Sequence, residues 1–478
     1  MEASLQELPQ GKKHPKGLYL LFFTELWERY SYFGMRAILV LYLTAELISG
    51  GLGVTPQAAM FIYGIFTGCV YFTPIIGGFI ADRFLGLRTA ITVGGVTIAI
   101  GNFVLFLLQS QTGLYLGLAL LIIGNGFFKP NMSTLVGELY HKNDKRKDAA
   151  FTTFYMGINI GSFFAPIIVG YLASQLFYTV SPSGIEHFGY KWAFLSSSIG
   201  MVFGQVLFNS LSKKYLVNIG KKPARTEAQD NKKHTNPLTK KEKQRTKAVL
   251  ILACFVVFFW AGFEQAGSSF TLYTKNFVDR ELFGFTIPVS WFQSLNPLFI
   301  IILAPIISLL WMKLGKSKRG DLKITTKMAL GMILLGLGFM ILLPAVMQTG
   351  SNELHDFTKA NVMFIVLTYL LHTLGELFLS PVGLSLVSKV APLKIASLLM
   401  GTWMAATGVA NLIAGQLASL TASLGYLEIF SVIGAMAIIL GLVLLTISKK
   451  LTTMMQIDED EDEDIEEVNT EAPLVKGT

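Results

Sequence analysis

Long apolar segments recur along the whole chain and constrain its fold more than any other feature. Each exceeds the roughly 18 residues that mark a transmembrane helix, and each is continuously apolar, whereas β-barrel strands alternate. Only 15% of the residues are charged, against about 25% in soluble domains. The expected spans are 16–49, 56–81, 88–109, 113–138, 147–176, 190–216, 247–277, 287–313, 325–347, 361–389, 395–421 and 426–449. The sequence therefore predicts an all-α polytopic membrane protein with 12 transmembrane helices.

Positive charge is distributed unevenly between the two ends of these spans. Of the 39 Lys and Arg residues, 31 lie in the N-terminus, in the even-to-odd loops and in the flank after the last span. The opposite loops hold only Lys191, Lys275, Arg280 and Lys359. By the positive-inside rule, both termini are expected in the cytoplasm. The net charge of +8 thus follows from membrane topology, and no nucleic-acid partner is expected.

The first span carries four ionisable residues on one helical face. Glu28, Arg29 and Arg36 lie three, four and eleven residues after Glu25, and Tyr32 lies seven after it. These offsets return to one side of a helix. Each charge at the bilayer centre costs about 2.5–3.5 kcal/mol on insertion scales. Either the residues form a structural ion-pair cluster that joins helices, or they relay protons and substrate, and we favour the relay.

Three later spans carry isolated charges beside small residues. Lys129, Glu264 and Glu376 are each flanked by Gly, Ser or Pro, which are common where a membrane helix lines a cavity. A carboxylate that exchanges a cationic partner for water as the cavity opens would load and release protons. His372 lies one helical turn before Glu376. We expect it to pack between helices, with a proton role as the alternative.

The intramembrane charges suit a substrate with charges of both signs. Arg36 and Lys129 would bind a carboxylate, and Arg offers a bidentate fork. Glu376 would bind an ammonium group, and Asn159 and Asn296 would bind amide groups between the two ends. Interhelical hydrogen bonding is an equal alternative for Asn159. The aromatic walls would come from Tyr32, Tyr71, Trp260 and Trp403, for each of which packing or interface anchoring is the alternative.

The chain divides into two halves of six spans. We expect an N-terminal bundle over 1–216, a basic cytoplasmic linker over 217–246, and a C-terminal bundle over 247–450. The remaining segment, 451–478, is acidic and is expected to be a disordered cytoplasmic tail, with partner binding as the alternative. This layout resembles the major facilitator superfamily, in which two bundles rock around a central site.

The loop after the second span resembles the cytoplasmic signature of that superfamily. It reads GGFIADRFLGLR and ends at Arg88. The resemblance implies that Asp82 and Arg83, together with Arg88, latch the helix ends of the N-terminal bundle. A tight turn with ordinary cytoplasmic charges would explain the two arginines but not the glycines and the aspartate.

No metal site and no cofactor is expected. The two cysteines, Cys69 and Cys254, lie in apolar spans far apart in the sequence. They form neither a disulfide framework nor a CxxC motif. We expect both to be packing residues.

Six segments together resemble the proton-coupled oligopeptide transporter family. The first, Glu25–Gly34, is similar to its ExxER signature, and the resemblance extends over roughly residues 16–450. The other five segments are Gly126–Asn131, Phe154–Ser162, Phe263–Gln265, Trp291–Pro297 and Gly375–Pro381. The resemblance implies proton-driven uptake of di- and tripeptides across a lipid bilayer, by a chain that functions as a monomer.

The resemblance also implies roles for individual residues. Proton coupling is expected of Glu25, Glu28, Arg29, Lys129 and Glu264. Two ion pairs, Arg36–Glu264 and Lys129–Glu376, would close the extracellular side. The amino terminus of the peptide would bind Glu376, and its carboxylate would bind Arg36 and Lys129.

Some features depart from the family pattern. The linker is too short for the extra helix pair of many bacterial members, and Phe33 stands where tyrosine is common. The loop at 348–360 is short, which indicates a prokaryotic protein and hence the inner membrane. One alternative is a family relative for nitrate or another anion, which Glu376 would repel. The other is a membrane receptor that binds peptides without moving them, which would leave the charges of the first span without purpose.

Overall fold

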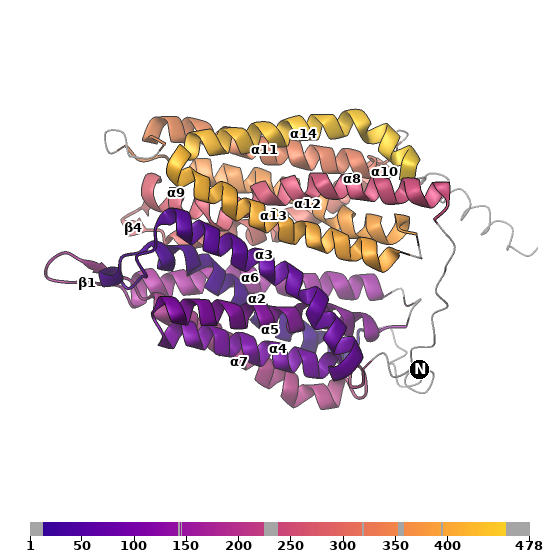
Figure 1. Ribbon diagram of the computed structural model, residues 1–478, viewed down its shortest axis with the longest axis horizontal. Coiled ribbons are helices and arrows are strands. Elements are labelled where there is room, and N and C mark those ends of the chain that lie inside the picture. Colours follow the sequence, from indigo (N-terminus) through magenta and orange to yellow (C-terminus); the bar gives the residue numbers. More distant parts are fainter. Residues whose placement is uncertain are drawn as a thin grey trace, which may run out of the picture.

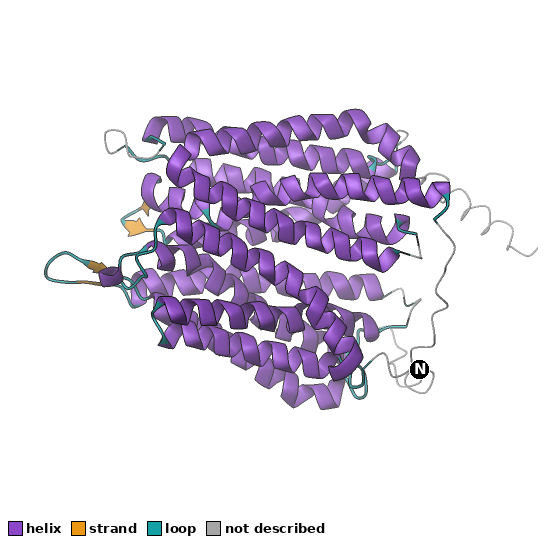
Figure 2. Cartoon of the chain, viewed as in Figure 1, coloured by secondary structure: helices purple, strands orange, loops and turns teal. Residues whose placement is uncertain are grey.

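Helices make up nearly all of the fold and run alongside one another (Figures 1 and 2). The computed structural model describes residues 13–141, 144, 146–223, 238–317, 320–351, 358–392 and 395–455. The first half contains α2 (Lys16–Thr44), η1 (Leu47–Ser49), α3 (Pro56–Ile80), η2 (Ala81–Leu85), α4 (Leu87–Leu107), α5 (Gln111–Glu138), α6 (Lys147–Tyr171), η3 (Leu172–Leu176) and α7 (Tyr190–Tyr215). A small antiparallel hairpin, β1 (Thr179–Val180) and β2 (Glu186–His187), precedes α7.

The second half begins with a helix that is broken into three segments. Its first part is α8 (Lys240–Phe263), which continues through η5 (Glu264–Gly267) into α9 (Ser269–Phe277). A second hairpin, β3 (Glu281–Leu282) and β4 (Phe285–Thr286), follows. The remaining helices are η6 (Val289–Ser294), α10 (Leu295–Gly315), α11 (Ile324–Thr349), α12 (Met363–Val390), α13 (Ala396–Leu424) and α14 (Tyr426–Met455).

The predicted count of twelve spans is confirmed. Ten helical segments in the described part of the chain are long and apolar enough to cross a membrane. The eleventh, α2, has 29 residues but carries the four charges noted above. The twelfth, α12, has a shorter apolar part, Met363–Leu379, among the residues described. The chain is therefore an all-α, multi-pass membrane protein, to which the two hairpins add only a few extended residues.

Each half has its own hydrophobic core. The first core is built mainly from side chains of α2 to α7, and the second from side chains of α8 to α14. The halves meet closely where α3 crosses α13. A Cβ atom on Gly64 would lie 2.5 Å from the Cα of Gly415, so the two backbones touch only because both positions are glycine.

Two helices extend across the predicted boundaries of the linker and the tail. The helix α8 begins at Lys240, inside the predicted linker 217–246, because the Thr239 side chain and the Glu242 carboxylate form a capping box there. The helix α14 runs on to Met455, into the predicted tail. The central part of the linker, 224–237, and the tail from 456 lie outside the described residues.

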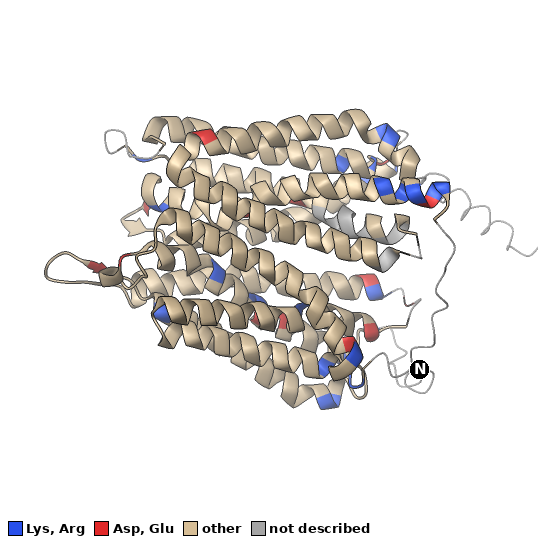
Figure 3. Ribbon diagram, in the orientation of Figure 1, with Lys and Arg blue, Asp and Glu red and all other residues tan. Residues whose placement is uncertain are grey.

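Charged residues gather at one end of the molecule. Figure 3 shows many Lys and Arg positions, coloured blue on the ribbon, at the end where α8 begins and α14 finishes. This distribution in space is the one that the loop counts of the sequence predict. We refer to this end as the basic end and to the opposite end, with both hairpins, as the outer end.

Candidate transport site between the two helix bundles

Three charges of α2 form a buried cluster. The Nε atom of Arg29 lies 2.7 Å from an oxygen of Glu25 and 2.9 Å from an oxygen of Glu28. All three side chains are buried, and Glu28 is 0% exposed. Apart from the ion pair between Arg29 and Glu28, both Glu28 oxygens and one Glu25 oxygen have no hydrogen-bond donor in the described part of the chain. The cluster therefore contains carboxylate oxygens that can accept a proton.

Helix α6 covers this cluster at unusually short range. A Cβ atom on Gly161 would lie 2.4 Å from the carbonyl oxygen of Leu26 and 3.0 Å from Cβ of Arg29. A second glycine, Gly157, allows the same approach beside Phe22. The two glycines let α6 exclude lipid and water from one side of the Arg29 side chain, as small residues do in membrane helix contacts.

Lys129 of α5 lies near the cluster. Its Nζ atom is 3.9 Å from the centre of the Tyr71 ring of α3, which is a cation–π contact. It also lies within electrostatic reach of Glu28, Glu25 and Arg29. Tyr71 and Lys129 were both predicted from the sequence, and the structure brings them together.

An ion pair connects the two halves near the outer end. Arg36 of α2 donates through its guanidinium to the carboxylate of Glu264 in η5. The Nε–H of Arg36 also donates to the Tyr63 hydroxyl oxygen of α3, at 2.5 Å. A Cβ atom on Gly267 would lie 1.8 Å from that hydroxyl, so only glycine fits at this position. The break in the helix after Phe263 thus places both Glu264 and Gly267 against Tyr63.

The predicted pair between Lys129 and Glu376 is not formed, although the structure describes both residues. The Glu376 carboxylate instead accepts a hydrogen bond of 2.7 Å from the Asn296 amide of α10. The same amide group donates to the Thr373 hydroxyl at 3.2 Å. Lys129 lies against Tyr71, as described above. In this conformation one of the two predicted inter-bundle ion pairs is present and the other is open.

The remaining predicted substrate residues lie on separate helices around the interface. Tyr32 and Trp403 are buried and Trp260 is half-buried. The Asn159 amide donates within its own helix, to the carbonyl oxygen of Tyr155 at 3.0 Å. His372 lies within an aromatic cage, its ring close to those of Phe263, Phe270 and Phe339. Such an enclosure favours packing for His372.

A row of hydrogen bonds closes the outer end, and the sequence did not predict it. Ser290 and Ser294 of η6 donate to the carbonyl oxygens of Pro166 and Phe163, at 3.0 and 2.7 Å. The Trp291 ring nitrogen between them donates to a third carbonyl of α6, that of Ile167, at 2.9 Å. We call these three bonds the outer clasp. Backbone acceptors leave no pattern in the sequence, which is why the clasp could not be predicted.

At the basic end, the structure forms contacts of the predicted latch through one of its three residues. Arg88, rather than Asp82 or Arg83, makes the contact: it donates to the carbonyl oxygen of Val217 and to the Ser212 hydroxyl, at 2.8 and 2.9 Å. Arg83 lies over the rings of its own neighbours in the chain, and Asp82 forms no ion pair with any residue that the structure describes. Both residues belong to the π-helical turn of η2.

A second contact at the basic end involves Arg146, which directly precedes α6. Arg146 donates to the Asp144 carboxylate, and these bonds hold the pKa of Asp144 at about 2. Arg146 also donates to the carbonyl oxygen of Lys13, at 2.7 Å. Arg146 therefore ties the start of α6 to the segment that enters α2.

Two residues of the site were missed by the sequence reasoning. Tyr63 binds Arg36 and Thr373 binds Asn296, yet neither carries a charge. The signal for Tyr63 was its spacing: Tyr63, Thr67 and Tyr71 recur every fourth residue in an otherwise apolar span. Thr373 lies three residues before Glu376 on the same helical face, which is the corresponding signal.

Two six-helix bundles with buried, lipid-shielded charges where they meet define a multi-pass membrane transporter of the major facilitator fold. The model of the POT family matches residues 88–229 and 224–427. The chain therefore belongs to the POT family.

Individual relatives match over nearly the whole chain. The "Uncharacterized transporter YclF" of Bacillus subtilis (strain 168) is 35% identical over 95% of this chain and 98% of its own length. The "Di-/tripeptide transporter" of Lactococcus lactis subsp. cremoris is 31% identical over 92% of this chain and 96% of its own. A crystal structure of peptide transporter POT in complex with sulfate is 32% identical, with a TM-score of 0.83 over 94% of this chain and 97% of that one.

Proposed function

We propose that this chain is a symporter that couples inward proton flow to the uptake of di- and tripeptides by alternating access. The observation that carries the proposal is the buried cluster of Glu25, Glu28 and Arg29, in which carboxylate oxygens lack donors. A buried carboxylate oxygen without a donor costs free energy, and a proton on that oxygen removes part of the cost. The printed names of relatives, "Di-/tripeptide transporter" among them, support the peptide substrate.

The conformation supports alternating access. The Arg36–Glu264 pair and the outer clasp join the halves toward the outer end. Opening that end requires all of these bonds to break, which leaves a buried Arg36 without its partner. A peptide carboxylate that enters the site would replace Glu264 as the partner of Arg36, so substrate binding and the gate compete for one guanidinium.

The site offers complementary groups at both ends of a short peptide. Glu376, held by Asn296, would bind the amino terminus, and Arg36 with Lys129 would bind the carboxylate. Lys129 would change partners in this step, from the Tyr71 ring to the substrate or to Glu376. The substrate would be two or three residues long, and the aromatic side chains Tyr32, Tyr71, Trp260 and Trp403 would contact its side chains.

The proposal includes the setting in which the transporter works. The protein would lie in the inner membrane of a prokaryotic cell with both termini in the cytoplasm, and it would work as a monomer without a cofactor other than the coupling protons. The membrane potential would add about 2.3 kcal/mol per charge per 100 mV.

Uptake into liposomes tests the proposal directly. Purified protein is reconstituted, a pH gradient and a potential are imposed separately, and a labelled dipeptide is added outside. We expect accumulation against the peptide gradient together with peptide-dependent acidification of the lumen. Binding without accumulation would favour the receptor alternative, and nitrate uptake without peptide uptake would favour the anion alternative.

A further inference from the structure

Two hairpins stand at the outer end, and their tips differ in chemistry. The tip of the β1–β2 hairpin is the polar segment 181–184, whose sequence is SPSG. This hairpin projects beyond the helix ends in Figure 1. The β3–β4 hairpin stays beside the helix ends. Its tip is apolar: Leu282 is 51% exposed and Phe283 is 101% exposed. A fully exposed phenylalanine needs a partner that the described protein does not supply.

The backbone geometry of the turn does not explain why position 283 is phenylalanine. Leu282 pairs with Phe285, so that Phe283 and Gly284 form a two-residue loop, and both have positive φ, 52° and 79°. Such loops favour Asn followed by Gly, because a bulky residue rarely adopts positive φ. Asparagine would suit the backbone better at this position. No ring of a described residue stacks on Phe283, so packing within the protein does not explain it either.

The hairpin is continuous with a lipid-facing surface. Helix α10 follows it after η6 and buries only Pro297 and Ile300 among its residues. Its exposed side chains form an apolar face of the kind that contacts acyl chains in a membrane protein; they include Ile301, Ile302, Ile306, Leu309 and Leu310. Phe285 of β4 packs against Trp291 at 5.7 Å between ring centres, which connects the hairpin to the start of this face.

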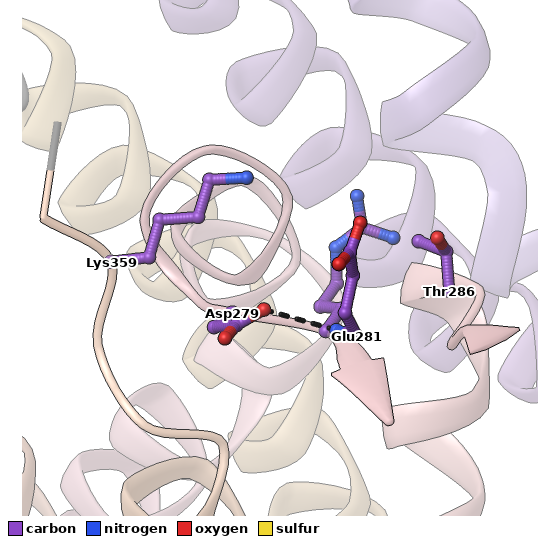
Figure 4. A pocket seen from close by; sticks show the side chains of 5 residues that line it. Asp279, Glu281, Thr286 and Lys359 are labelled. Carbon is purple, nitrogen blue, oxygen red and sulfur yellow. Dashed lines mark hydrogen bonds between the residues drawn. The ribbon is translucent and has the colours of Figure 1, made fainter. Parts of the chain in front are cut away.

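The base of the β3–β4 hairpin is charged, whereas its tip is apolar. A pocket of about 390 Å³ opens there, and Figure 4 shows Asp279, Glu281, Thr286 and Lys359 around it. Arg280 completes the lining. Charges of both signs beside an apolar tip match the boundary between lipid headgroups and acyl chains, where amphipathic elements bind.

The first half repeats the feature at the corresponding place. The hairpin follows the first span of the second half, and η1 follows the first span of the first half. In η1, Leu47 is 73% exposed and Ile48 is 56% exposed. The two halves of a major facilitator fold are related by an axis along the membrane normal, so the two apolar pairs follow equivalent spans of the two bundles.

We propose that the tip Leu282–Phe283 is a membrane anchor that inserts into the lipid leaflet at the outer end, with Leu47–Ile48 as its counterpart on the first bundle. Each anchor would fix the depth of its bundle while the two bundles rock. The proposal requires only that the chain spans a bilayer, and it does not depend on peptide transport.

Spin-label accessibility tests the anchor. Cys69 and Cys254 are replaced by serine, and a nitroxide is attached to cysteine at Leu282 or, as the control, at Ser183 in the polar tip. The protein is reconstituted in phosphatidylethanolamine–phosphatidylglycerol vesicles. We expect the label at 282 to collide several-fold more often with oxygen than with a water-soluble nickel chelate, and the label at 183 to show the reverse. A label at 282 as open to nickel as the label at 183 would overturn the proposal.

A second substitution tests whether Phe283 itself holds the hairpin tip in lipid. Phe283→Ser in the chain labelled at 282 should move that label toward water, whereas Phe283→Leu should keep it in lipid. A label that stays in lipid with serine at 283 would show that Phe283 does not anchor the hairpin. Should the cysteine-free chain not fold, Phe283→Trp in the natural sequence is measured instead. Its added fluorescence should be quenched by lipid brominated near the headgroup, and unchanged fluorescence would again overturn the proposal.

Discussion

The Ser290 hydroxyl occupies the space that a side chain on Gly170 would fill. A Cβ atom at Gly170 would lie 2.1 Å from the Ser290 oxygen and 3.0 Å from a ring carbon of Trp291. That oxygen donates its proton to the Pro166 carbonyl at 3.0 Å. The outer clasp therefore depends on the absence of a side chain at one position of α6.

Gly170→Ala should weaken closure of the outer end. The added methyl group forces η6 away from α6 and stretches the bonds made by Ser290 and Trp291, each of which contributes about 1 kcal/mol. Spin labels at Ser183 and Asn276, on opposite halves, measure the result by pulsed electron resonance. We expect a larger population of long distances than in the unsubstituted chain.

Two further variants check this interpretation. Adding Ser290→Ala to Gly170→Ala removes the closest contact, so the double variant should lose less closure than the sum of the single effects. Gly401→Ala is the matched control, because a Cβ atom there meets nothing within 4 Å, and its distances should be unchanged. Additive effects of the first two substitutions would contradict the steric explanation.

The Arg36–Glu264 pair should be far more sensitive to truncation than an ion pair at the surface. Glu264→Ala leaves Arg36 buried without a carboxylate, and breaking a buried pair in this way costs about 3–5 kcal/mol. We expect a large fall in the thermal midpoint in detergent and loss of uptake. Asp321→Ala breaks the pair with Lys327, in which Asp321 is 42% exposed, and should cost about 1 kcal/mol or less. Equal shifts for the two variants would show that Arg36 finds water or another partner.

Sequence reasoning located the charged residues because lipid makes each of them conspicuous. Glu25, Glu28, Arg29 and Arg36 stand out in an apolar span, and their helical spacing placed them on one face, where the structure shows Glu25, Glu28 and Arg29 in contact. Membrane spans are similarly easy to predict, since their length and apolarity are imposed by the bilayer.

Partners were harder to predict than residues. The outer clasp uses backbone carbonyls, and Arg88 reaches the Val217 carbonyl oxygen, so neither contact has a second side chain that a sequence could reveal. The pairing of Glu376 with Asn296 rather than Lys129 belongs to one conformation of a protein expected to have several. A single sequence specifies the set of possible partners and not which of them is bound in a given state.

Glu28→Gln should uncouple transport from protons. Glutamine keeps the volume of the side chain but cannot take up a proton at the oxygens that lack donors. We expect accumulation driven by a pH gradient to be lost in liposomes, while exchange of labelled for unlabelled peptide continues. Glu46→Gln, an exposed acid in the loop after the same helix, should leave both activities unchanged. Accumulation that persists in Glu28→Gln would refute the coupling role.

Recognition of the peptide amino terminus should depend on Glu376 directly and on Asn296 through it. Glu376→Ala removes a charged acceptor, and hydrogen bonds to charged groups contribute about 1.5–3 kcal/mol, or roughly 10- to 100-fold in affinity. Asn296→Ala leaves the carboxylate in place but removes the 2.7 Å bond that orients it, so its effect should be smaller, at about fivefold for a loss of about 1 kcal/mol.

Competition by a dipeptide and by its N-acetylated form against a labelled peptide measures both effects. The loss should fall on the free amine and spare the acetylated form, because the latter has no positive charge for Glu376 to bind. Equal losses for the two forms would assign Glu376 to the structure of the bundle instead of to the substrate.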